Sequence, residues 1–218
     1  MTYDEIRKDE AVKVYIAQAD SSMEALGFTE HSFAHVGHVA HMAGDVLEKL
    51  GYDSRTVELA RIAGYLHDIG NLVNRVDHSQ SGAVMAFRIL DRMNFPPEEI
   101  AAIVTAIGNH DEGTGVPVNA VAAALIIADK SDVRRSRVRR QADIREDIHD
   151  RVNYAVTDAS LEVLPQEQQI LLSLTIDTEI SPVMEYFEIF MKRMLLCRKA
   201  AEKLGYSFRL KINGQLLV

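Results

Sequence analysis

Apolar residues recur at intervals of three and four through about the first 150 residues, and short polar or glycine-containing segments separate these runs. This spacing predicts amphipathic helices. The helix ends follow from serine, proline and glycine residues at positions that favour helix starts and stops. The predicted helices run from about 2 toward 27, and over about 33–50, 54–66, 79–94, 98–110 and 119–133.

Individual start signals support these helices. Thr2 and Glu5 form the spacing of a capping box ahead of the first helix. Ser54 is the predicted N-cap of the third helix, and Ser79 or Ser81 that of the fourth.

The pattern changes after about residue 150. LSLTID and SFRLKI are predicted strands, and Asn213-Gly214 after the second is the signal of a two-residue hairpin. A helix that opens at Ser181-Pro182 lies between them, and 153–164 can supply a further strand. The chain is therefore predicted to be mainly α, with a helical bundle and a small C-terminal α+β extension. The predicted boundaries are 1–150 and 151–218.

Composition and charge exclude several classes of function. Lysine and arginine number 24 against 32 aspartates and glutamates, so the net charge of −8 disfavours the coating of nucleic acid. The chain has no apolar stretch of about 18 residues, and its first ten residues are charged. We therefore expect a cytoplasmic protein without a membrane partner. Cys197 is the only cysteine, so we expect nitrogen and oxygen ligands for any metal.

The candidate chemistry lies where polar residues meet apolar helices. His67 and Asp68 close the run ARIAGYLHDIG, and other histidines and an aspartate stand in similar places. Such residues predict a metal site between the helices of a bundle. The candidate ligands are His35, His67, Asp68 and Asp129 for a first ion, and His78 and His110 for a second ion that Asp68 bridges.

Imidazole and carboxylate ligands suit borderline or hard divalent ions, so Mn, Fe, Co, Ni, Zn and Mg are all candidates. One or two ions per chain fit the ligand set. Two ions about 3.5–4 Å apart can activate a water and hold the oxygens of a phosphoryl group.

The order His35, His67-Asp68, Asp129 resembles the HD superfamily of metal-dependent phosphohydrolases. The flanking segments HVGHVAHMA, GYLHDIGN and IIADKSD are similar to the helices of that family and span about 33–132. The added His78 and His110 resemble ligands of its two-metal branches, which include cyclic-di-GMP phosphodiesterases and bacterial diadenosine tetraphosphate hydrolases. The resemblance implies an HD-type bundle, the two ligand sets above, Asp68 as a catalytic residue and a metal-activated water as the nucleophile.

Candidate substrate contacts stand beside these ligands. Many relatives have lysine at the position of Asn71, and Lys130 follows the last ligand along its helix. Arg134 begins a run of five arginines that ends at Arg140. This run is either a funnel for a phosphorylated substrate or a solvated helix or subunit contact that pairs with the acidic segment DIREDIHD.

The function that these residues predict is metal-dependent hydrolysis of a phosphate ester in a nucleotide or another small phosphorylated metabolite. One alternative is a diiron oxygenase on the same scaffold, because the ligand set suits iron equally well. A second alternative is a metal-binding signalling module without catalysis. An apolar stripe of methionine and phenylalanine between Met184 and Met194 is either core or the interface of a homodimer.

Overall fold

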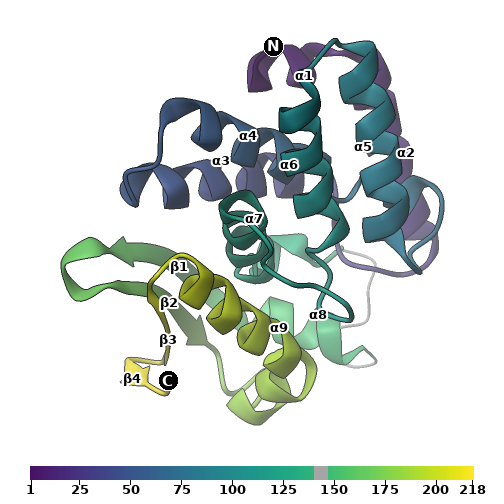
Figure 1. Ribbon diagram of the computed structural model, residues 1–218. Coiled ribbons are helices and arrows are strands. Elements are labelled where there is room, and N and C mark those ends of the chain that lie inside the picture. The colour runs from purple at the N-terminus through teal and green to yellow at the C-terminus, as the bar shows by residue number, and fades with distance from the viewer. Residues whose placement is uncertain (140–146) are drawn as a thin grey trace.

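Helices make up the N-terminal two thirds of the computed structural model, which describes residues 1–139 and 147–218 (Figure 1). The helical elements before the first strand are α1 (Tyr3–Lys8), α2 (Glu10–Ala25), α3 (Phe33–Lys49), α4 (Ser54–Leu66), the 3-10 turn η1 (Ile69–Leu72), α5 (His78–Arg92), α6 (Pro97–Gly108), α7 (Ala120–Lys130), the 3-10 turn η2 (Arg135–Arg137) and α8 (Ile148–Ala155). None of the described helices combines the length and the apolar character that a membrane span needs.

Helix α7 forms the centre of the molecule. Every residue from Val121 to Lys130 is buried, because α3, α4, α6 and α9 (Val183–Lys203) pack around it. A helix that is covered on all sides has no polar face, which explains the unbroken apolar sequence of this segment. The two charged residues at its end, Asp129 and Lys130, are therefore carried into the interior.

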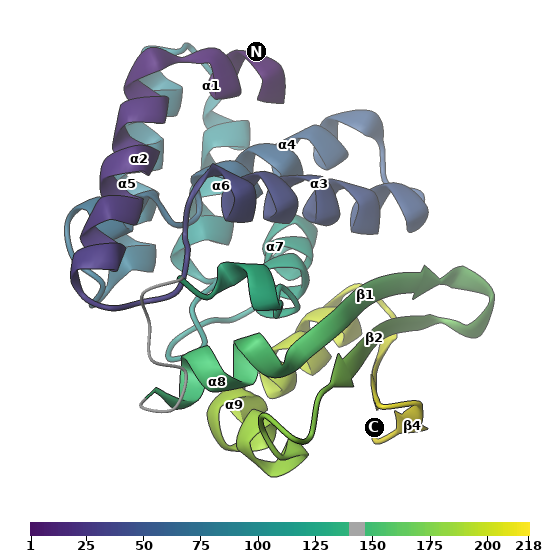
Figure 2. The same ribbon diagram turned by 180° about the vertical axis from the view of Figure 1, so that it is seen from behind.

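The C-terminal part is a small sheet with one helix. The strands β1 (Val156–Leu164), β2 (Gln169–Ile176), β3 (Ser207–Ile212) and β4 (Gln215–Leu216) lie in that order, and the 3-10 turn η3 (Pro165–Glu167) joins the first two. β2 and β3 pair in parallel, so α9 crosses between them. α9 packs on these strands and on α7, so it joins the sheet to the helical core (Figure 2).

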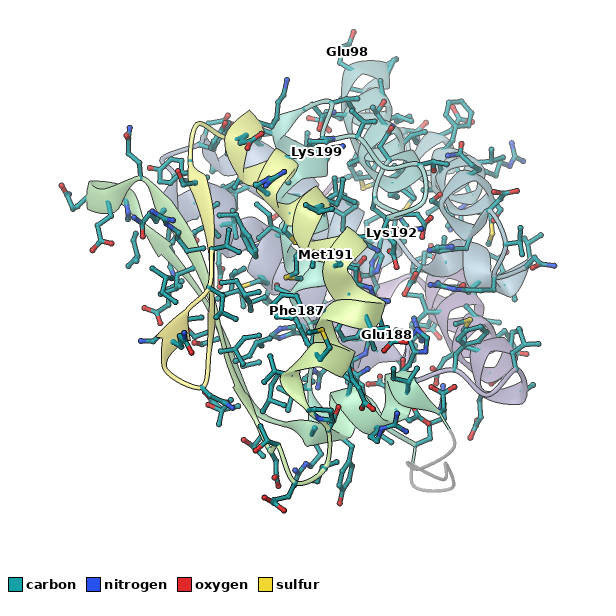
Figure 3. All side chains as sticks on the ribbon, turned by 90° about the horizontal axis from the view of Figure 1, so that it is seen from below. Glu98, Phe187, Glu188, Met191, Lys192 and Lys199 are labelled. Atoms are coloured by element: carbon teal, nitrogen blue, oxygen red, sulfur yellow. The ribbon has the colours of Figure 1, made fainter. Side chains whose placement is uncertain are left out.

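Helix α9 has a buried and an exposed apolar face. Tyr186, Phe190 and Met194 are buried at a spacing of four residues, and pack as core. Met184 and Met191 are 74% and 44% exposed, and Figure 3 shows Met191 on the outer side of the helix. The predicted stripe of methionine and phenylalanine is therefore divided between these two faces.

The fold class is confirmed, with local differences. The single long first helix was wrong: it breaks at Asp9, whose side chain caps α2 through the Val12 amide, while the Thr2 capping box starts α1. Asp53 caps α4 in place of Ser54, because its carboxylate accepts from the amides of Arg55 and Thr56. The Asn-Gly hairpin is confirmed, with φ of 49° and 82° at its two residues. The predicted boundary after residue 150 falls within α8.

Candidate metal centre

The ends of five helices deliver the six candidate ligands to one place. Each ligand belongs to a helix that is apolar on its buried side. The ligand stands at the start of that helix, just after its end or on the buried face itself, so burial of the helix carries the ligand inward. All six side chains are buried, and His35, His67 and His110 have no exposed surface. Their elements are α3 for His35, the end of α4 for His67 and Asp68, the start of α5 for His78, the end of α6 for His110 and the last turn of α7 for Asp129.

The turn after His67 lets α5 approach the centre. Gly70 lies against the start of α5, so closely that a Cβ atom there would be 2.0 Å from the carbonyl oxygen of His78 and 2.4 Å from the amide nitrogen of Gly82. Only glycine fits at such a contact between two backbones. The glycine of the HDIG segment therefore fixes where His78 begins its helix.

One group of atoms gathers around His35 and His67. The Nε2 atoms of both histidines lie 3.5 Å from Oδ1 of Asp129, and 3.5 and 3.4 Å from Oδ2 of Asp68. Donor atoms at these separations can reach a common ion, since metal–ligand bonds of about 2.0–2.2 Å place ligand atoms roughly 3 Å apart. His35, His67 and Asp129 accordingly form one of the two groups within residues 1–139 and 147–218 that could hold an ion.

A second group shares Asp68 with the first. His78 Nε2 lies 3.6 Å from Oδ1 of Asp68 and 3.2 Å from Nε2 of His110. His67, Asp68 and His110 also lie close enough to one another to hold an ion together. Asp68 therefore presents one oxygen to each group, which is the placement that a bridging carboxylate requires.

The opposite nitrogen of each imidazole fixes its tautomer. A carbonyl or carboxylate oxygen only accepts hydrogen bonds, so each Nδ1 that contacts one carries a proton, and in the neutral ring Nε2 is then the nitrogen with the free lone pair. These Nδ1 contacts are His35 to Asp132 Oδ2 at 2.7 Å, His67 to Gly64 O at 2.8 Å, His78 to Arg75 O at 3.1 Å and His110 to Ile107 O at 2.6 Å. Histidines that bind metals are oriented in the same way.

The surroundings of the four Nε2 atoms show whether a metal ion fits between these residues. The Nε2 atoms of His35 and His67 are buried and have no hydrogen-bond partner among the described residues. Those of His78 and His110 face each other across 3.2 Å, where two lone pairs repel. A divalent cation would satisfy all four nitrogens and the two carboxylates, so the residues present fit a metal of the kind that imidazole and carboxylate prefer.

Electrostatics favours a cation at the centre. Burial opposes a charge on His67, but the carboxylates of Asp68 and Asp129 outweigh it and raise the pKa of His67 to about 10. Burial also opposes the carboxylate of Asp68, but the charge of His67 and the hydrogen bond to His35 hold its pKa well below its usual range. Burial, followed by the charge of Lys130, lowers the pKa of His110. Without a metal, a proton on His67 thus balances the carboxylates.

A pH dependence of metal binding follows. His67, with its pKa raised to about 10, is protonated at neutral pH, whereas a metal ligand must be unprotonated. Metal binding therefore releases at least one proton, and we expect the affinity for Mn²⁺ to rise up to about tenfold per pH unit for each proton released. Titration calorimetry in buffers of different ionisation enthalpy would count the protons. A Mn²⁺ affinity that does not change between about pH 6 and 8 would contradict this expectation.

Asp132 supports the centre and was not among the predicted site residues. Its carboxylate accepts from His35 Nδ1 at 2.7 Å and also pairs with Arg134 and Arg137. Burial raises its pKa less than His35 and Arg137 lower it, so the carboxyl stays ionised. A carboxylate behind a metal-binding imidazole orients the ring and strengthens it as a ligand. The sequence signal was its position three residues after Asp129, one helical turn on.

A chain of ion pairs leads from Asp129 to the C-terminal helix. Lys130 is buried, and its Nζ lies 2.7 Å from Oδ2 of Asp129 and 2.7 Å from Oε2 of Glu112. Arg193 of α9 binds the other oxygen of Glu112 at 3.1 Å. Lys130 thus holds one oxygen of Asp129 and leaves the other for the centre. Neither Glu112 nor Arg193 was predicted, because nothing local in the sequence links them to Asp129.

The structure gives the three predicted substrate contacts other partners. Asn71 donates to the carbonyl and to Oδ1 of Asp68 at 3.0 Å, so it orients that ligand. Lys130 is enclosed by its two carboxylates. Arg134 pairs with Asp132 at 2.7 Å and lines a separate cavity of about 550 Å³ beside β1.

The arginine run after α7 fastens segments within the chain. Arg135 donates to the carbonyl of Tyr154, and Arg137 to that of Glu30. Arg139 donates to the carbonyl of Phe28 and pairs with Asp20 at 2.7 Å. In the described part of the run, these guanidinium groups are therefore occupied by contacts within the chain. Arg140 and residues 143–146 of DIREDIHD lie outside the described residues.

The remaining histidines differ in their distance from the centre. His31 donates to the carbonyl of Thr29 through Nδ1, and its Nε2 lies 4.0 Å from Oδ2 of Asp68. His38 lies behind the centre, 3.8 Å from Asp132, while His41 bonds within its own helix and His149 is exposed beside Asp147. His31 alone of these approaches a ligand.

Comparison with known proteins gives consistent matches. A family model described as the HD domain matches residues 32–163. The uncharacterized protein MJ1020 of Methanocaldococcus jannaschii is 28% identical over 162 residues, which cover 64% of this chain and 62% of that protein. Ribonuclease Y of Sulfurimonas denitrificans is 28% identical over 177 residues, which cover 73% of this chain and 33% of that enzyme.

A solved structure is also similar. The predicted HD superfamily hydrolase from an uncultured Thermotogales bacterium shares 24% identity at a TM-score of 0.47, over 61% of this chain and 75% of its own. The chain spans less than two thirds of the length of both curated relatives above. The family match at 32–163 covers more than half of the chain and contains all six candidate ligands. The chain therefore belongs to the HD-domain family.

Proposed function

We propose that the protein is a metal-dependent hydrolase that cleaves phosphate esters, with His35, His67, Asp68 and Asp129 as ligands of one ion and Asp68, His78 and His110 as ligands of a second. The observation that carries this proposal is the set of four buried histidines that converge on two carboxylates, with the Nε2 atoms of His35 and His67 lacking a hydrogen-bond partner among the described residues and those of His78 and His110 facing each other. Membership of the HD-domain family supports it.

Each residue has a defined task in this proposal. A divalent ion, when bound, lowers the pKa of a coordinated water and withdraws charge from a phosphoryl oxygen. Asp68 joins the two ligand groups through its two oxygens, and Asn71 holds it in that orientation. Lys130 keeps Asp129 in place, and Asp132 does so for His35.

A small phosphorylated substrate, such as a nucleotide, suits this protein better than a nucleic acid. Three of its relatives are named ribonuclease Y, at 28%, 34% and 32% identity, and ribonucleases cleave phosphodiesters of RNA. The net charge of −8, however, gives this chain no general attraction for a polyanion. The arginine run after α7, which could have supplied such attraction, is occupied within the chain in its described part.

Metal content and hydrolysis test the proposal together. We expect about two ions per chain in the wild type and about one in His110→Ala, because this substitution removes a ligand of the second ion only. Elemental analysis would measure the content, and a panel of phosphate mono- and diesters would be tried with each metal. The absence of hydrolysis with every metal would contradict the proposal, and oxygen consumption by the iron-loaded protein would then favour the oxygenase.

A further inference from the structure

A cavity of about 350 Å³ lies beside the metal centre. Three of its lining residues each touch the centre or its supports. His31 approaches Asp68 to 4.0 Å, Arg75 approaches His78 Nε2 to 3.3 Å, and Glu112 binds Lys130 at 2.7 Å. The cavity therefore adjoins the centre through these three side chains, although none of the six candidate ligands lines it.

Arg75 differs from the other arginines of this cavity. Arg137 pairs with Asp132 and donates to the carbonyl of Glu30, and Arg193 pairs with Glu112. Arg75 has no carboxylate within 4.0 Å in residues 1–139 and 147–218. Its guanidinium group makes long hydrogen bonds, at 3.4 Å to Oδ1 of Asn71 and 3.3 Å to His78 Nε2, and lies 5.7 Å from the centre of the Phe28 ring, which leaves its edge without an anionic partner. A half-buried guanidinium with such weak partners is ready for an anionic ligand.

The contact between Arg75 and His78 also indicates that Arg75 is available to an anionic ligand. His78 Nδ1 carries its proton toward the carbonyl of Arg75, so Nε2 has a single lone pair to offer. That lone pair can serve the Arg75 guanidinium or an ion, and not both. Once an ion takes it, Arg75 keeps its charge at the edge of the centre and needs a new acceptor.

The carboxyl groups of the cavity leave Arg75 unopposed. Asp147 caps α8 through the amides of His149 and Asp150, and Glu112 is held by Lys130 and Arg193. Burial, followed by the neighbouring charge of Asp147, raises the pKa of Asp150, and no ion pair joins Asp150 to Arg75 among the described residues. An anion that enters the cavity therefore meets in Arg75 a cation that has no carboxylate partner in the described part of the chain.

We propose that Arg75 binds the phosphoryl group of the substrate in this cavity, and that the substrate is a small phosphomonoester. This proposal rests on the proposed hydrolase function. The planar guanidinium group donates to two oxygens at once. A monoester has three oxygens outside the ester bond and a diester has two, so a monoester has an oxygen left for Arg75 beside the ions. The volume lies at the lower end of the roughly 300–1,000 Å³ of small-molecule sites.

The reaction balances without a further reactant. The oxygen of water forms a new bond to phosphorus and the ester bond between phosphorus and oxygen breaks. The leaving alkoxide takes up a proton that water has lost, so the products are an alcohol and inorganic phosphate. Inorganic phosphate is then both a product and a ligand of Arg75, which makes it a probe of the site without turnover.

The first test measures phosphate binding by titration calorimetry. Wild type, Arg75→Gln, Arg75→Lys and Arg88→Gln are compared at the same metal content by elemental analysis; Arg88 is an exposed arginine on α5 and serves as the matched control. We expect Arg75→Gln to weaken binding at least about tenfold, because hydrogen bonds between charged groups are lost. Arg75→Lys keeps the positive charge but cannot donate to two oxygens at once, so its phosphate affinity should lie between those of the wild type and Arg75→Gln. Phosphate binding by Arg75→Gln as tight as that of the wild type would overturn the role of Arg75.

The second test compares p-nitrophenyl phosphate with bis(p-nitrophenyl) phosphate. We expect kcat/KM of the wild type to favour the monoester at least about tenfold, and Arg75→Gln to reduce this preference. A wild-type preference for the diester would overturn the substrate class. No hydrolysis of either compound with any metal would overturn the proposed function and with it the substrate class, whereas phosphate binding would still decide the role of Arg75.

Discussion

Asp68→Asn should lower kcat by about 10³-fold or more, because one carboxylate serves both ligand groups. Its Oδ2 lies 3.4–3.5 Å from Nε2 of His67 and His35, and its Oδ1 lies 3.6 Å from Nε2 of His78. The substitution keeps the shape and removes the charge, so both ions lose a ligand and several kcal/mol of transition-state stabilisation. Hydrolysis of the best substrate in the phosphate panel, together with metal content, measures the effect.

The matched control is Asp91→Asn, which makes the same chemical change at an exposed position of α5. We expect it to keep the metal content and kcat of the wild type, since it lies away from all six ligands. Thermal unfolding of both variants would separate loss of function from loss of fold. Activity of Asp68→Asn within about tenfold of the wild type, in folded protein, would remove Asp68 from the mechanism.

Gly70→Ala should lower the free energy of unfolding by about 4 kcal/mol or more. The added methyl group would meet the carbonyl oxygen of His78 at 2.0 Å and the amide of Gly82 at 2.4 Å, and neither backbone atom can move without shifting α5. Overpacking of a rigid contact costs more than the about 1–3 kcal/mol usual in cores. Urea unfolding measures the stability, and elemental analysis shows whether the shift of His78 also costs an ion.

Gly37→Ala supplies the comparison. Gly37 lies in α3, and a Cβ atom there would have no neighbour within 4 Å. Alanine in an open helical position stabilises by about 0.5–1 kcal/mol relative to glycine. The two substitutions are chemically identical, so they separate the effect of the contact from the effect of the added methyl group. Equal free energies of unfolding of the two variants would show that the backbone of α5 leaves room for a methyl group at Gly70.

The sequence predicted the helices and the convergence of the ligand residues, because both leave local signals. The apolar period places His35 and Asp129 on buried faces, and His67 and Asp68 follow directly on such a face. The signals of helix caps are local as well. The structure has Asp53 and not Ser54 as the N-cap of α4, because both residue types can cap a helix and only the backbone angles decide between two neighbours. The continuous first helix failed for the same reason, since Asp9 favours a cap as well as a helix.

The supports of the site could not be predicted, because their partners are distant in the chain. Glu112 meets Arg193 81 residues away, and Asp132 meets His35 97 residues away. For Arg75, the sequence could not predict the absence of a carboxylate partner. Its importance lies in the lack of a carboxylate within reach in the described chain, and the sequence alone does not state which charges remain unpaired after folding.

The arginines after α7 illustrate how composition misleads. Five guanidinium groups in seven residues suggest a single charged surface. In the structure, Arg134 pairs with the carboxylate of Asp132, whereas Arg135, Arg137 and Arg139 donate to the carbonyl groups of Tyr154, Glu30 and Phe28. Charge density along the chain therefore says little about charge density in space, because each long side chain can turn to its own partner.

The ion-pair chain from Asp129 through Lys130 and Glu112 to Arg193 also orders events during synthesis. A ribosome releases the six ligand residues well before α9, and Arg193 is the last member of this chain to emerge. Until α9 docks on α7, Glu112 lacks its arginine and Lys130 lacks the cover that buries it. The nascent protein can therefore collect its ligands early, but it completes the supports of the centre only after translation of α9.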